Sequence, residues 1–277
     1  MAHDIHITSD MPIKQRPYTS PQAKERIVND SFSKMMKMNV IEASDSDWAS
    51  PIVLVRKPDG SERFCVDYRK LNAVTIKDSY PMPHVESKLN KLYGCQFFTS
   101  LDCINGYWQI RLSDRAKKLV AFTTTKGLST FNFMPFGLCN ANALFQRVIE
   151  KVISNLLNSS AYVDILTFSK TFDAHLIHLQ ALFERLKTAN IKIKTSKCHI
   201  ASDKIMFLGY RITSKGVCID DSRIKVLKNY PKPSKSKNVK EFLGLTGYYR
   251  QFIRDYADLT EPLNKLTRKN VKFTWCD

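Results

Sequence analysis

The fold is decided by one stretch of the chain, Ala161-Tyr162-Val163-Asp164-Ile165-Leu166-Thr167-Phe168. The stretch is short, apolar and rich in β-branched and aromatic residues, a composition that predicts a buried strand or hairpin. A single acid, Asp164, lies in its middle. Because burying an unpaired carboxylate is costly, we expect Asp164 to meet a cation, a metal ion or strong hydrogen-bond donors.

The composition around this stretch is that of a globular protein with a basic surface. The 277 residues are 43% hydrophobic and 25% charged, which is enough for a sizeable core in one lobed domain or two domains. The net charge is +17, from 43 Lys and Arg against 26 Asp and Glu. This excess predicts a polyanionic partner, most often a nucleic acid, although a basic protein without such a partner is the simpler alternative.

Cysteine spacing and hydropathy limit the class of protein further. The seven cysteines form no Cys-x-x-Cys pair, so we expect a reducing compartment and neither a disulfide framework nor a zinc site. The N-terminus lacks a signal-peptide core, and no apolar run approaches the length of a membrane span. His175 and His178 have no acidic or cysteine cluster nearby, and we interpret them as packing or surface residues. A soluble intracellular protein is expected.

The alternation of helical and strand-like patterns predicts an α+β fold. The expected helices cover residues 21–38, 83–93, 138–157 and 171–190, with another after 237 that is broken near Gly244 and Gly247. The expected strands are 52–56 and 63–68, which a tight turn joins into a basic-tipped hairpin, and 96–103, 108–112, 119–124 and the stretch around Asp164. Residues 204–212 and 217–219 could form a further hairpin, and residues 1–19 an extended arm.

Ordered sequence blocks along nearly the whole chain resemble one known family. They include Trp48-Ala-Ser-Pro-Ile-Val-Leu-Val-Arg-Lys57, Arg63-Phe-Cys-Val-Asp-Tyr-Arg-Lys-Leu-Asn72, Leu101-Asp102, Gly106-Tyr-Trp-Gln-Ile110, Met134-Pro-Phe-Gly-Leu-Cys-Asn-Ala141 and Phe207-Leu-Gly-Tyr210. The chain is similar to the reverse transcriptase of gypsy-type LTR retrotransposons, relatives of retroviral polymerases. The resemblance implies an RNA-directed DNA polymerase that extends a primer on an RNA or DNA template with dNTPs.

The family fold is a right hand of fingers, palm and thumb, followed by a connection toward ribonuclease H. By resemblance, residues 1–85 form the N-terminal arm and fingers, and 86–210 the palm with interleaved fingers. Residues 211–239 would form the thumb, and 240–277 its remainder and the start of the connection. The abrupt last residues suggest a piece of a polyprotein whose ribonuclease H and integrase lie elsewhere. A cytoplasmic particle and the nucleus are both open as locations.

The resemblance also assigns the catalytic groups. Asp102 and Asp164 would hold two Mg²⁺ ions, with Mn²⁺ as an alternative, and the backbone carbonyl of Cys103 would add a ligand. Phosphoryl transfer needs such hard oxygen ligands because catalysis consists mostly of positioning and charge neutralisation. Lys197 matches a lysine that protonates the leaving pyrophosphate, with a plain surface lysine as the alternative.

Five further residues match positions that contact the nucleotide. Tyr107 would exclude a ribose 2′-hydroxyl, and its alternative role is that of a core tyrosine. Arg63 would bind the triphosphate, since a guanidinium suits phosphate oxygens, and Lys57 or Arg56 would be a second cation. A solvated turn is the alternative for Lys57. Phe136 and Gly137 would line the nucleotide pocket.

The chain departs from the family pattern at the very stretch that decides its fold. The family has Tyr-x-Asp-Asp, whereas Tyr162-Val163-Asp164 is followed by Ile165. One Asp is missing, and the sequence alone does not tell which. The chain would therefore be an active polymerase or a catalytically impaired relative that still binds primer and template. A milder departure is Asn142, where the family usually has Pro.

Overall fold

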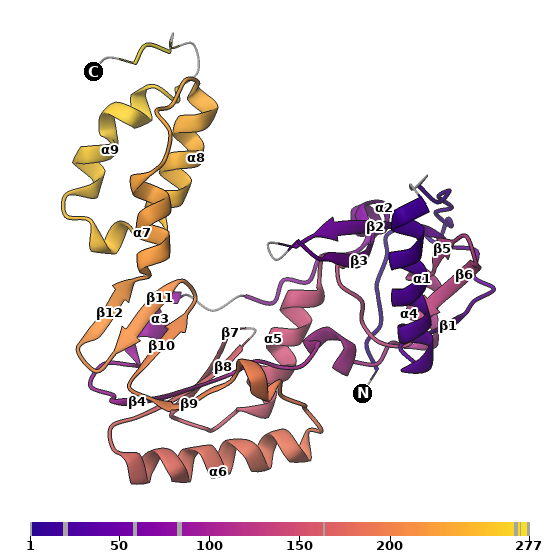
Figure 1. The fold of residues 1–277 in the computed structure, drawn as a ribbon, viewed down its shortest axis with the longest axis horizontal. Helices are drawn as coiled ribbons and strands as arrows, with labels where there is room; N and C mark the ends of the chain where they lie inside the picture. Colours follow the sequence, from indigo (N-terminus) through magenta and orange to yellow (C-terminus); the bar gives the residue numbers. More distant parts are fainter. Residues whose placement is uncertain are drawn as a thin grey trace. The chain divides into compact units, whose positions relative to one another are not determined.

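The structure, a computed structural model, describes residues 2–18, 22–57, 60–81, 85–162, 164–268, 271 and 273–275 (Figure 1). The chain forms two units. One comprises Met1–Pro83, Leu101–Thr167 and Leu176–Cys198, and the other His84–Ser100, Phe168–His175 and His199–Asp277. Helices and sheets are mixed along the chain, which confirms the α+β class. Residue 21, where the first predicted helix begins, lies outside the described residues.

The first unit contains a five-stranded sheet of order β1-β6-β5-β2-β3. Its strands are β1 (Ile41–Ala43), β2 (Ser50–Arg56), β3 (Glu62–Val66), β5 (Phe122–Thr124) and β6 (Gly127–Phe131). Strands β2 and β3 pair antiparallel, which confirms the predicted hairpin. The helices of this region are α1 (Gln22–Lys37), α2 (Arg69–Val74) and α4 (Asp114–Leu119).

The N-terminal arm is extended, as predicted, and backbone hydrogen bonds hold it against the same unit. The amide of Thr8 donates to the Val74 carbonyl at 2.8 Å, and that of Gln15 to the Ala49 carbonyl at 2.9 Å. Ile5 is 4% exposed, so the arm also contributes to the hydrophobic core.

Two predicted strands near the centre of the chain are wrong in part. Residues 108–112 were expected to be extended, but η1 (Gly106–Gln109) is a 3₁₀-helix there. Close packing against this turn requires Gly at its start, because a Cβ on Gly106 would lie 2.8 Å from Cζ of Phe145. The predicted strand 119–124 starts only at Phe122, since α4 ends at Leu119 after Ser113 caps its start.

The central hairpin belongs to a four-stranded sheet of order β7-β8-β4-β9. Its strands are β7 (Ser159–Tyr162), β8 (Asp164–Ser169), β4 (Phe97–Leu101) and β9 (His199–Ser202). In the sequence, helix α5 (Ala141–Val152) precedes β7 and helix α6 (Phe172–Thr188) follows β8. Helix α5 is shorter than the predicted 138–157 and buries Phe145 and Ile149.

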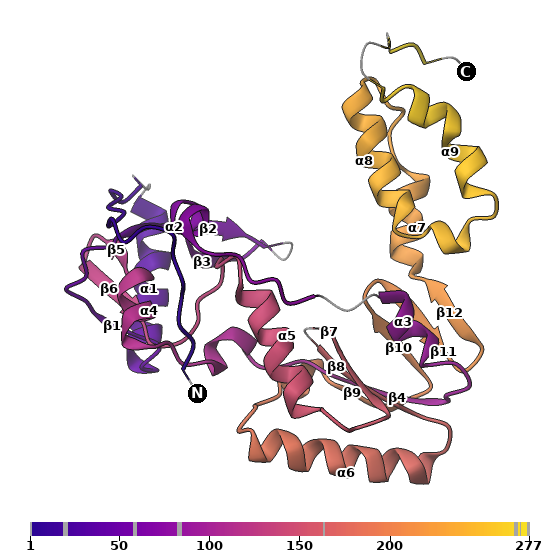
Figure 2. The same ribbon diagram turned by 180° about the vertical axis from the view of Figure 1, so that it is seen from behind.

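The second unit contains a three-stranded sheet and a group of helices. The elements are β10 (Lys204–Phe207), β11 (Tyr210–Thr213), β12 (Gly216–Ile219), α3 (Val85–Asn90), α7 (Asp221–Lys228), α8 (Ser236–Gly247), η3 (Arg250–Phe252) and α9 (Tyr256–Lys265). Figure 2 shows α8 and α9 side by side. Leu208 and Gly209 have φ of 53° and 79°, so a turn divides the predicted strand 204–212. The predicted break near Gly244 is wrong, because α8 continues to Gly247.

His175 and His178 pack against polar side chains. His175 is fully buried, and its Nε2 and Nδ1 each lie 2.8 Å from a hydroxyl, of Thr99 and Ser169 respectively. His178 Nε2 lies 2.7 Å from the Asn158 amide. Both rings therefore contact neutral hydrogen-bonding side chains.

Candidate active site

The two acids of the predicted site line one cavity of about 450 Å³ in the first unit. Asp102 follows directly after β4, and Asp164 is the first residue of β8. The backbone holds Asp102 in place, because its carbonyl accepts a 2.8 Å hydrogen bond from the Lys194 amide. Strand pairing holds Asp164, which lies opposite Tyr162.

Most of the predicted site residues meet at this cavity. Its wall contains Arg63, Asp102, Cys103, Tyr107, Phe136, Asp164 and Lys197. Lys194 also lines it, although the sequence-based prediction did not include this residue. The spacing of Lys194 and Lys197 by three residues was the signal that could have found it.

Two predicted residues, Gly137 and Lys57, are not among the described residues that line the cavity. Gly137 has φ of 98°, and its carbonyl accepts a 2.8 Å hydrogen bond from the Asn72 side chain. It shapes the turn before α5. The Lys57 amide donates to the Ser61 carbonyl at 2.7 Å in the β2–β3 turn. Nucleotide contact by either residue stays a prediction.

The electrostatics of the cavity favour a bound cation. Burial and then the neighbouring Asp102 raise the pKa of Asp164, while Lys197 opposes the shift. Asp164 keeps solvent-exposed surface, so protein atoms surround the carboxylate without covering it. Lys197 Nζ lies 3.1 Å from Asp102 Oδ2. Two neighbouring carboxylates repel each other when both are ionised, and a cation between them removes that penalty.

The thiol of Cys103 is not a suitable metal ligand in its neutral form. Burial, followed by the charges of Asp164 and Asp102, raises its pKa to about 12. The thiol therefore stays protonated at neutral pH, whereas metal ligation needs the thiolate. Of the groups on Cys103, the backbone carbonyl remains the predicted ligand.

The donor set fits a divalent ion that protein and substrate hold together. The described residues contain no group of three or more His, Cys, Asp or Glu that could hold a metal ion. Mg²⁺ is commonly bound by one or two carboxylates, with substrate phosphates and water as the remaining ligands. Asp102 and Asp164 match that arrangement and do not form an all-protein cage.

Aromatic rings form part of the cavity wall. The Tyr107 ring centroid lies 5.1 Å from that of Phe136, and 5.6 Å from that of Phe145 in an edge-on arrangement. The Tyr107 hydroxyl donates a hydrogen bond to Oδ1 of Asn142. Burial raises the pKa of Tyr107, so the hydroxyl is neutral and able to donate. The Arg63 guanidinium lies 5.8 Å from the Phe136 ring centroid.

The missing acid leaves a short connection in the central hairpin. Pairing runs from Ser159 opposite Thr167 to Tyr162 opposite Asp164. In the sequence, only Val163 lies between Tyr162 and Asp164, the two residues of the last pair. Two residues would separate Tyr from the final Asp in the family pattern. Over the described residues the pairing of β7 with β8 is regular and contains no bulge.

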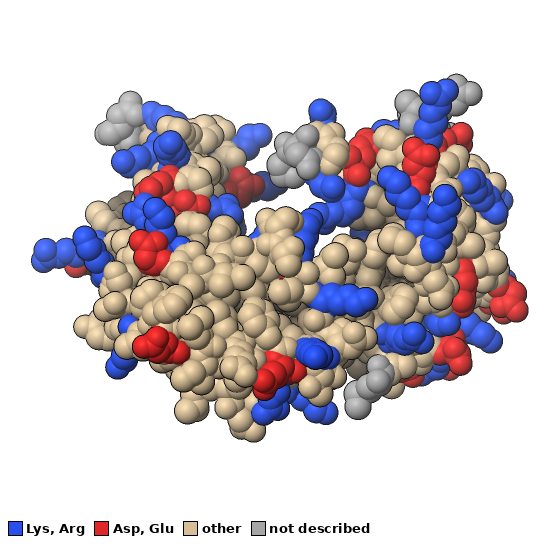
Figure 3. Space-filling view, turned by 60° about the horizontal axis from the view of Figure 1, so that its bottom comes forward, with Lys and Arg blue, Asp and Glu red and all other residues tan. Residues whose placement is uncertain are grey.

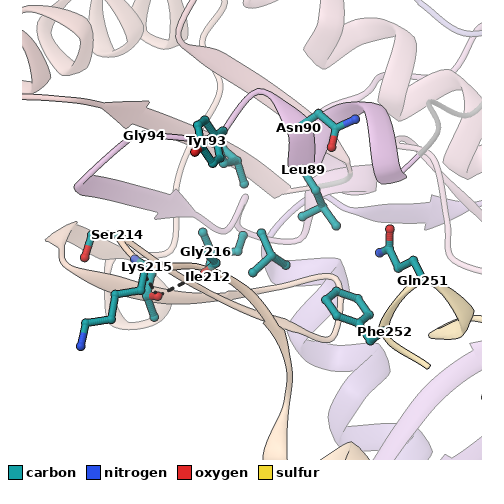
Figure 4. A pocket seen from close by; sticks show the side chains of 13 residues that line it. Leu89, Asn90, Tyr93, Gly94, Ile212, Ser214, Lys215, Gly216, Gln251 and Phe252 are labelled. Carbon is teal, nitrogen blue, oxygen red and sulfur yellow. Dashed lines mark hydrogen bonds between the residues drawn. The ribbon is translucent and has the colours of Figure 1, made fainter. Parts of the chain in front are cut away.

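A second cavity, in the other unit, has a different character (Figure 4). It measures about 730 Å³ and lies between the turn at Tyr93 and Gly94, the β11–β12 hairpin around Lys215, and Phe252. None of its described lining residues is an acid or a histidine. The paired carboxylates therefore distinguish the smaller cavity as the candidate active site.

The surface carries the basic excess expected from the sequence. Lys and Arg side chains are spread widely over the face in Figure 3, with Asp and Glu between them. In the second unit, Lys235, Lys237 and Lys240 lie at or near the start of α8. Among the described helices, none is long and apolar enough to cross a membrane.

Comparison with known proteins assigns the family. Residues 55–212 match the family described as reverse transcriptase (RNA-dependent DNA polymerase). The chain belongs to the reverse transcriptase family. It is 37% identical over 278 residues to a retrovirus-related Pol polyprotein from transposon 297 of Drosophila melanogaster, covering 98% of this chain and 26% of that protein. It is 32% identical to the transposon Tf2-3 polyprotein of Schizosaccharomyces pombe, over 98% of this chain and 21% of that protein.

Solved structures of reverse transcriptases share its fold. A foamy viral protease-reverse transcriptase in complex with double-stranded DNA has a TM-score of 0.88 and 26% identity, over 99% of this chain and 59% of that chain. The same viral protein in complex with an RNA/DNA hybrid has a TM-score of 0.84 and 25% identity, over 99% and 38%. The predicted right-hand polymerase fold is thereby confirmed. This reverse transcriptase chain spans about a quarter of the length of its curated relatives.

Proposed function

We propose that this chain is the polymerase segment of a retrotransposon polyprotein and extends a primer on an RNA or DNA template with dNTPs. The observation that carries the proposal is the meeting of Asp102 and Asp164 in one cavity with Arg63, Tyr107 and Lys197. The Pol and transposon polyproteins among its relatives support this function, as do the nucleic-acid complexes of its structural neighbours.

Asp102 and Asp164 would hold the divalent cation, with Mg²⁺ proposed first and Mn²⁺ as its substitute. When bound, the ion supplies charge neutralisation at the attacking oxygen and the leaving phosphate. The Cys103 carbonyl is the proposed additional oxygen ligand. The carboxylates themselves need to be ionised for this task, and the cation lowers the pKa that burial and mutual repulsion raise in Asp164.

Cations of the protein would bind the phosphates and provide a proton. Arg63 presents a guanidinium at the cavity, a group that forms paired hydrogen bonds with phosphate oxygens. Lys197 forms an ion pair with Asp102. In the proposed complex its ammonium turns to the pyrophosphate and donates a proton to the leaving oxygen. Lys57 remains a candidate second cation for the triphosphate.

The remaining assignments follow from the proposed function. Primer–template duplex would bind the basic surface through phosphate contacts, which predicts binding that weakens steeply as salt increases. We assign residues 1–85 to arm and fingers, 86–210 to palm with interleaved fingers, and 211–277 to thumb and the start of the connection. Ribonuclease H and integrase would lie elsewhere in the parent polyprotein, in a cytoplasmic particle or the nucleus.

A second candidate function is primer–template binding without efficient polymerisation. The observation that favours it is the single residue between Tyr162 and Asp164, because the family pattern has one more acid there. Loss of groups that merely support a metal site costs about 10- to 100-fold in affinity or activity. Loss of a carboxylate ligand should cost at least as much.

One extension experiment decides between the two functions. The parent chain and a variant with Asp inserted between Val163 and Asp164 are given a primed homopolymer template, dNTPs and Mg²⁺ or Mn²⁺. We expect the insertion variant to incorporate dNTPs at least about 10-fold faster than the parent. An insertion variant with Asn in place of the added Asp controls for loop length. Equal, measurable rates of dNTP incorporation by the parent and the Asp-insertion variant would reject the hypothesis of impaired catalysis. If none of the three proteins incorporates dNTPs, the polymerase function is rejected.

A further inference from the structure

The tyrosine of the candidate active site is held at both ends. Its ring packs at 5.1 Å from Phe136 and edge-on at 5.6 Å from Phe145. Its hydroxyl donates to Oδ1 of Asn142, on the first turn of α5. The ring contacts fix the body of Tyr107, and the hydrogen bond fixes its tip. A ring held in this way resists rotation about both of its side-chain torsions.

The side chain at position 142 makes this second attachment possible. The resemblance to gypsy-type reverse transcriptases implies Pro at this position, and a proline side chain contains no hydrogen-bond acceptor. Asn142 is the second residue of α5, where backbone amides have no partner within the helix. Proline therefore fits the backbone here, and the difference between Pro and Asn lies in the side chain. Asn142 adds a contact to Tyr107 that the usual residue does not provide.

We propose that Asn142 is a specificity-determining positioning residue, which clamps the Tyr107 ring and thereby strengthens the selection of deoxyribonucleotides over ribonucleotides. The inference rests on the proposed function, because it presumes that a nucleotide sugar lies against Tyr107. Asn142 acts through Tyr107 and need not touch the nucleotide. A rigid ring excludes a 2′-hydroxyl sterically, whereas a ring that swings away can admit one.

The expected effect follows from the strength of one hydrogen bond. Removing a neutral hydrogen bond changes an equilibrium by about 2- to 13-fold, equivalent to about 0.5–1.5 kcal/mol. We therefore expect Asn142→Ala to lower the preference for dNTP over rNTP by that factor. The change should appear mainly as tighter ribonucleotide binding, because the deoxyribose already fits beside the clamped ring.

The test measures equilibrium binding of a dNTP and the matching rNTP to the complex with a dideoxy-terminated primer–template, so it does not depend on turnover. The variants are Asn142→Ala, Asn142→Pro, Tyr107→Phe and Tyr107→Phe with Asn142→Ala. Tyr107→Phe keeps the ring and loses the hydroxyl. We expect the three single variants to lower the dNTP preference by similar factors, and the double variant to lower it no further than either parent substitution.

A matched control separates this role from general effects of losing an asparagine. Asn264→Ala replaces an exposed asparagine in α9 and should leave the preference unchanged. The inference is overturned if the parent prefers dNTPs and Asn142→Ala keeps the same preference, or if the effects of the two substitutions multiply in the double variant. A parent complex that binds dNTP and rNTP equally would instead contradict the sugar-selecting role of Tyr107, and the clamp with it.

Discussion

Asp67 should be one of the acids on which the stability of the first unit depends most. Its side chain is 7% exposed and forms a 2.6 Å ion pair with Arg69. The Asp67 carboxylate also accepts hydrogen bonds from Arg69 Nε at 2.8 Å, the Arg69 backbone amide at 3.1 Å and the Tyr18 hydroxyl at 2.8 Å. The carboxylate thus connects the N-terminal arm to the start of α2.

The cost of Asp67→Asn can be worked out from these contacts. The substitution turns an amide NH₂ toward donors and removes the charge, so at least one donor loses its acceptor. Hydrogen bonds to charged groups contribute about 1.5–3 kcal/mol to stability. The Arg69 side chain is 84% exposed, so solvent screening weakens the attraction between its charge and the Asp67 carboxylate. We expect a loss of about 1.5–3 kcal/mol at neutral pH.

The loss should depend on pH with a defined sign. Hydrogen bonding to Arg69 holds the pKa of Asp67 well below its ordinary value, against the opposing effect of burial. A carboxyl with a lowered folded pKa stabilises the protein fully above its unfolded pKa, near 4, and loses that contribution as pH falls toward the folded value. The difference between wild type and Asp67→Asn should therefore be largest above about pH 5 and shrink below pH 4.

Urea unfolding followed by tryptophan fluorescence provides the assay, because Trp48 and Trp108 both lie in the unit that contains Asp67. The matched control is Asp47→Asn, whose side chain is 76% exposed and pairs with Lys14 at 3.1 Å. An exposed pair of this kind contributes about 0–1 kcal/mol. Equal losses in the two variants, or a loss at Asp67 that grows as the pH falls, would refute the reasoning.

Three further predictions concern the candidate active site and the elements beside it. Gly106→Ala should destabilise the first unit by about 1–3 kcal/mol in urea unfolding, since its Cβ would lie 2.8 Å from the buried Phe145 ring. Gln146→Leu should cost about 1–3 kcal/mol in the same assay, because the buried Gln146 amide donates to the Ala161 carbonyl at 2.9 Å and Leu leaves that carbonyl without this donor. Mg²⁺ or Mn²⁺ should raise the thermal midpoint at neutral pH, and a chelator should reverse the shift; an unchanged midpoint at millimolar metal would contradict a cation site at the paired carboxylates.

Local signals in the sequence predicted the elements that depend on neighbouring residues. The β2–β3 hairpin was predictable because residues 57–61 carry turn chemistry between two apolar runs. The 3₁₀-helix at Gly106–Gln109 was not, and it packs closely against Phe145, 39 residues along the chain. The apolar pattern of residues 108–112 favours a strand, and tertiary packing overrides that preference.

The candidate site was predictable as a set of residues and not as a geometry. The resemblance placed Asp102, Arg63 and Tyr107 together, and all three line the cavity. It did not indicate Lys194, and nothing in the sequence pairs Asn142 with a tyrosine 35 residues away. Such contacts depend on how α5 packs against η1, which spacing along one chain does not encode.

Burial fixes the register of the central hairpin. Ile165 and Leu166 are 0% and 1% exposed, so β8 is buried on both faces and a one-residue slip would disturb both. The strand pairing therefore holds Asp164 opposite Tyr162 at the end of the hairpin.

The single residue between Tyr162 and Asp164 leads to a prediction about stability that is independent of activity. Two-residue loops suit antiparallel hairpins best, and one residue connects β7 to β8. Inserting Ala on either side of Asp164 should therefore raise the thermal midpoint by about 2–4 °C for each ~1 kcal/mol of relieved loop strain. Inserting Ala after Thr167, within the buried strand, should lower it. If all three Ala insertions lower the thermal midpoint, the short loop is not strained. If, in that case, the Asp insertion raises dNTP incorporation and neither Ala insertion beside Asp164 does so, the gain comes from the added carboxylate alone.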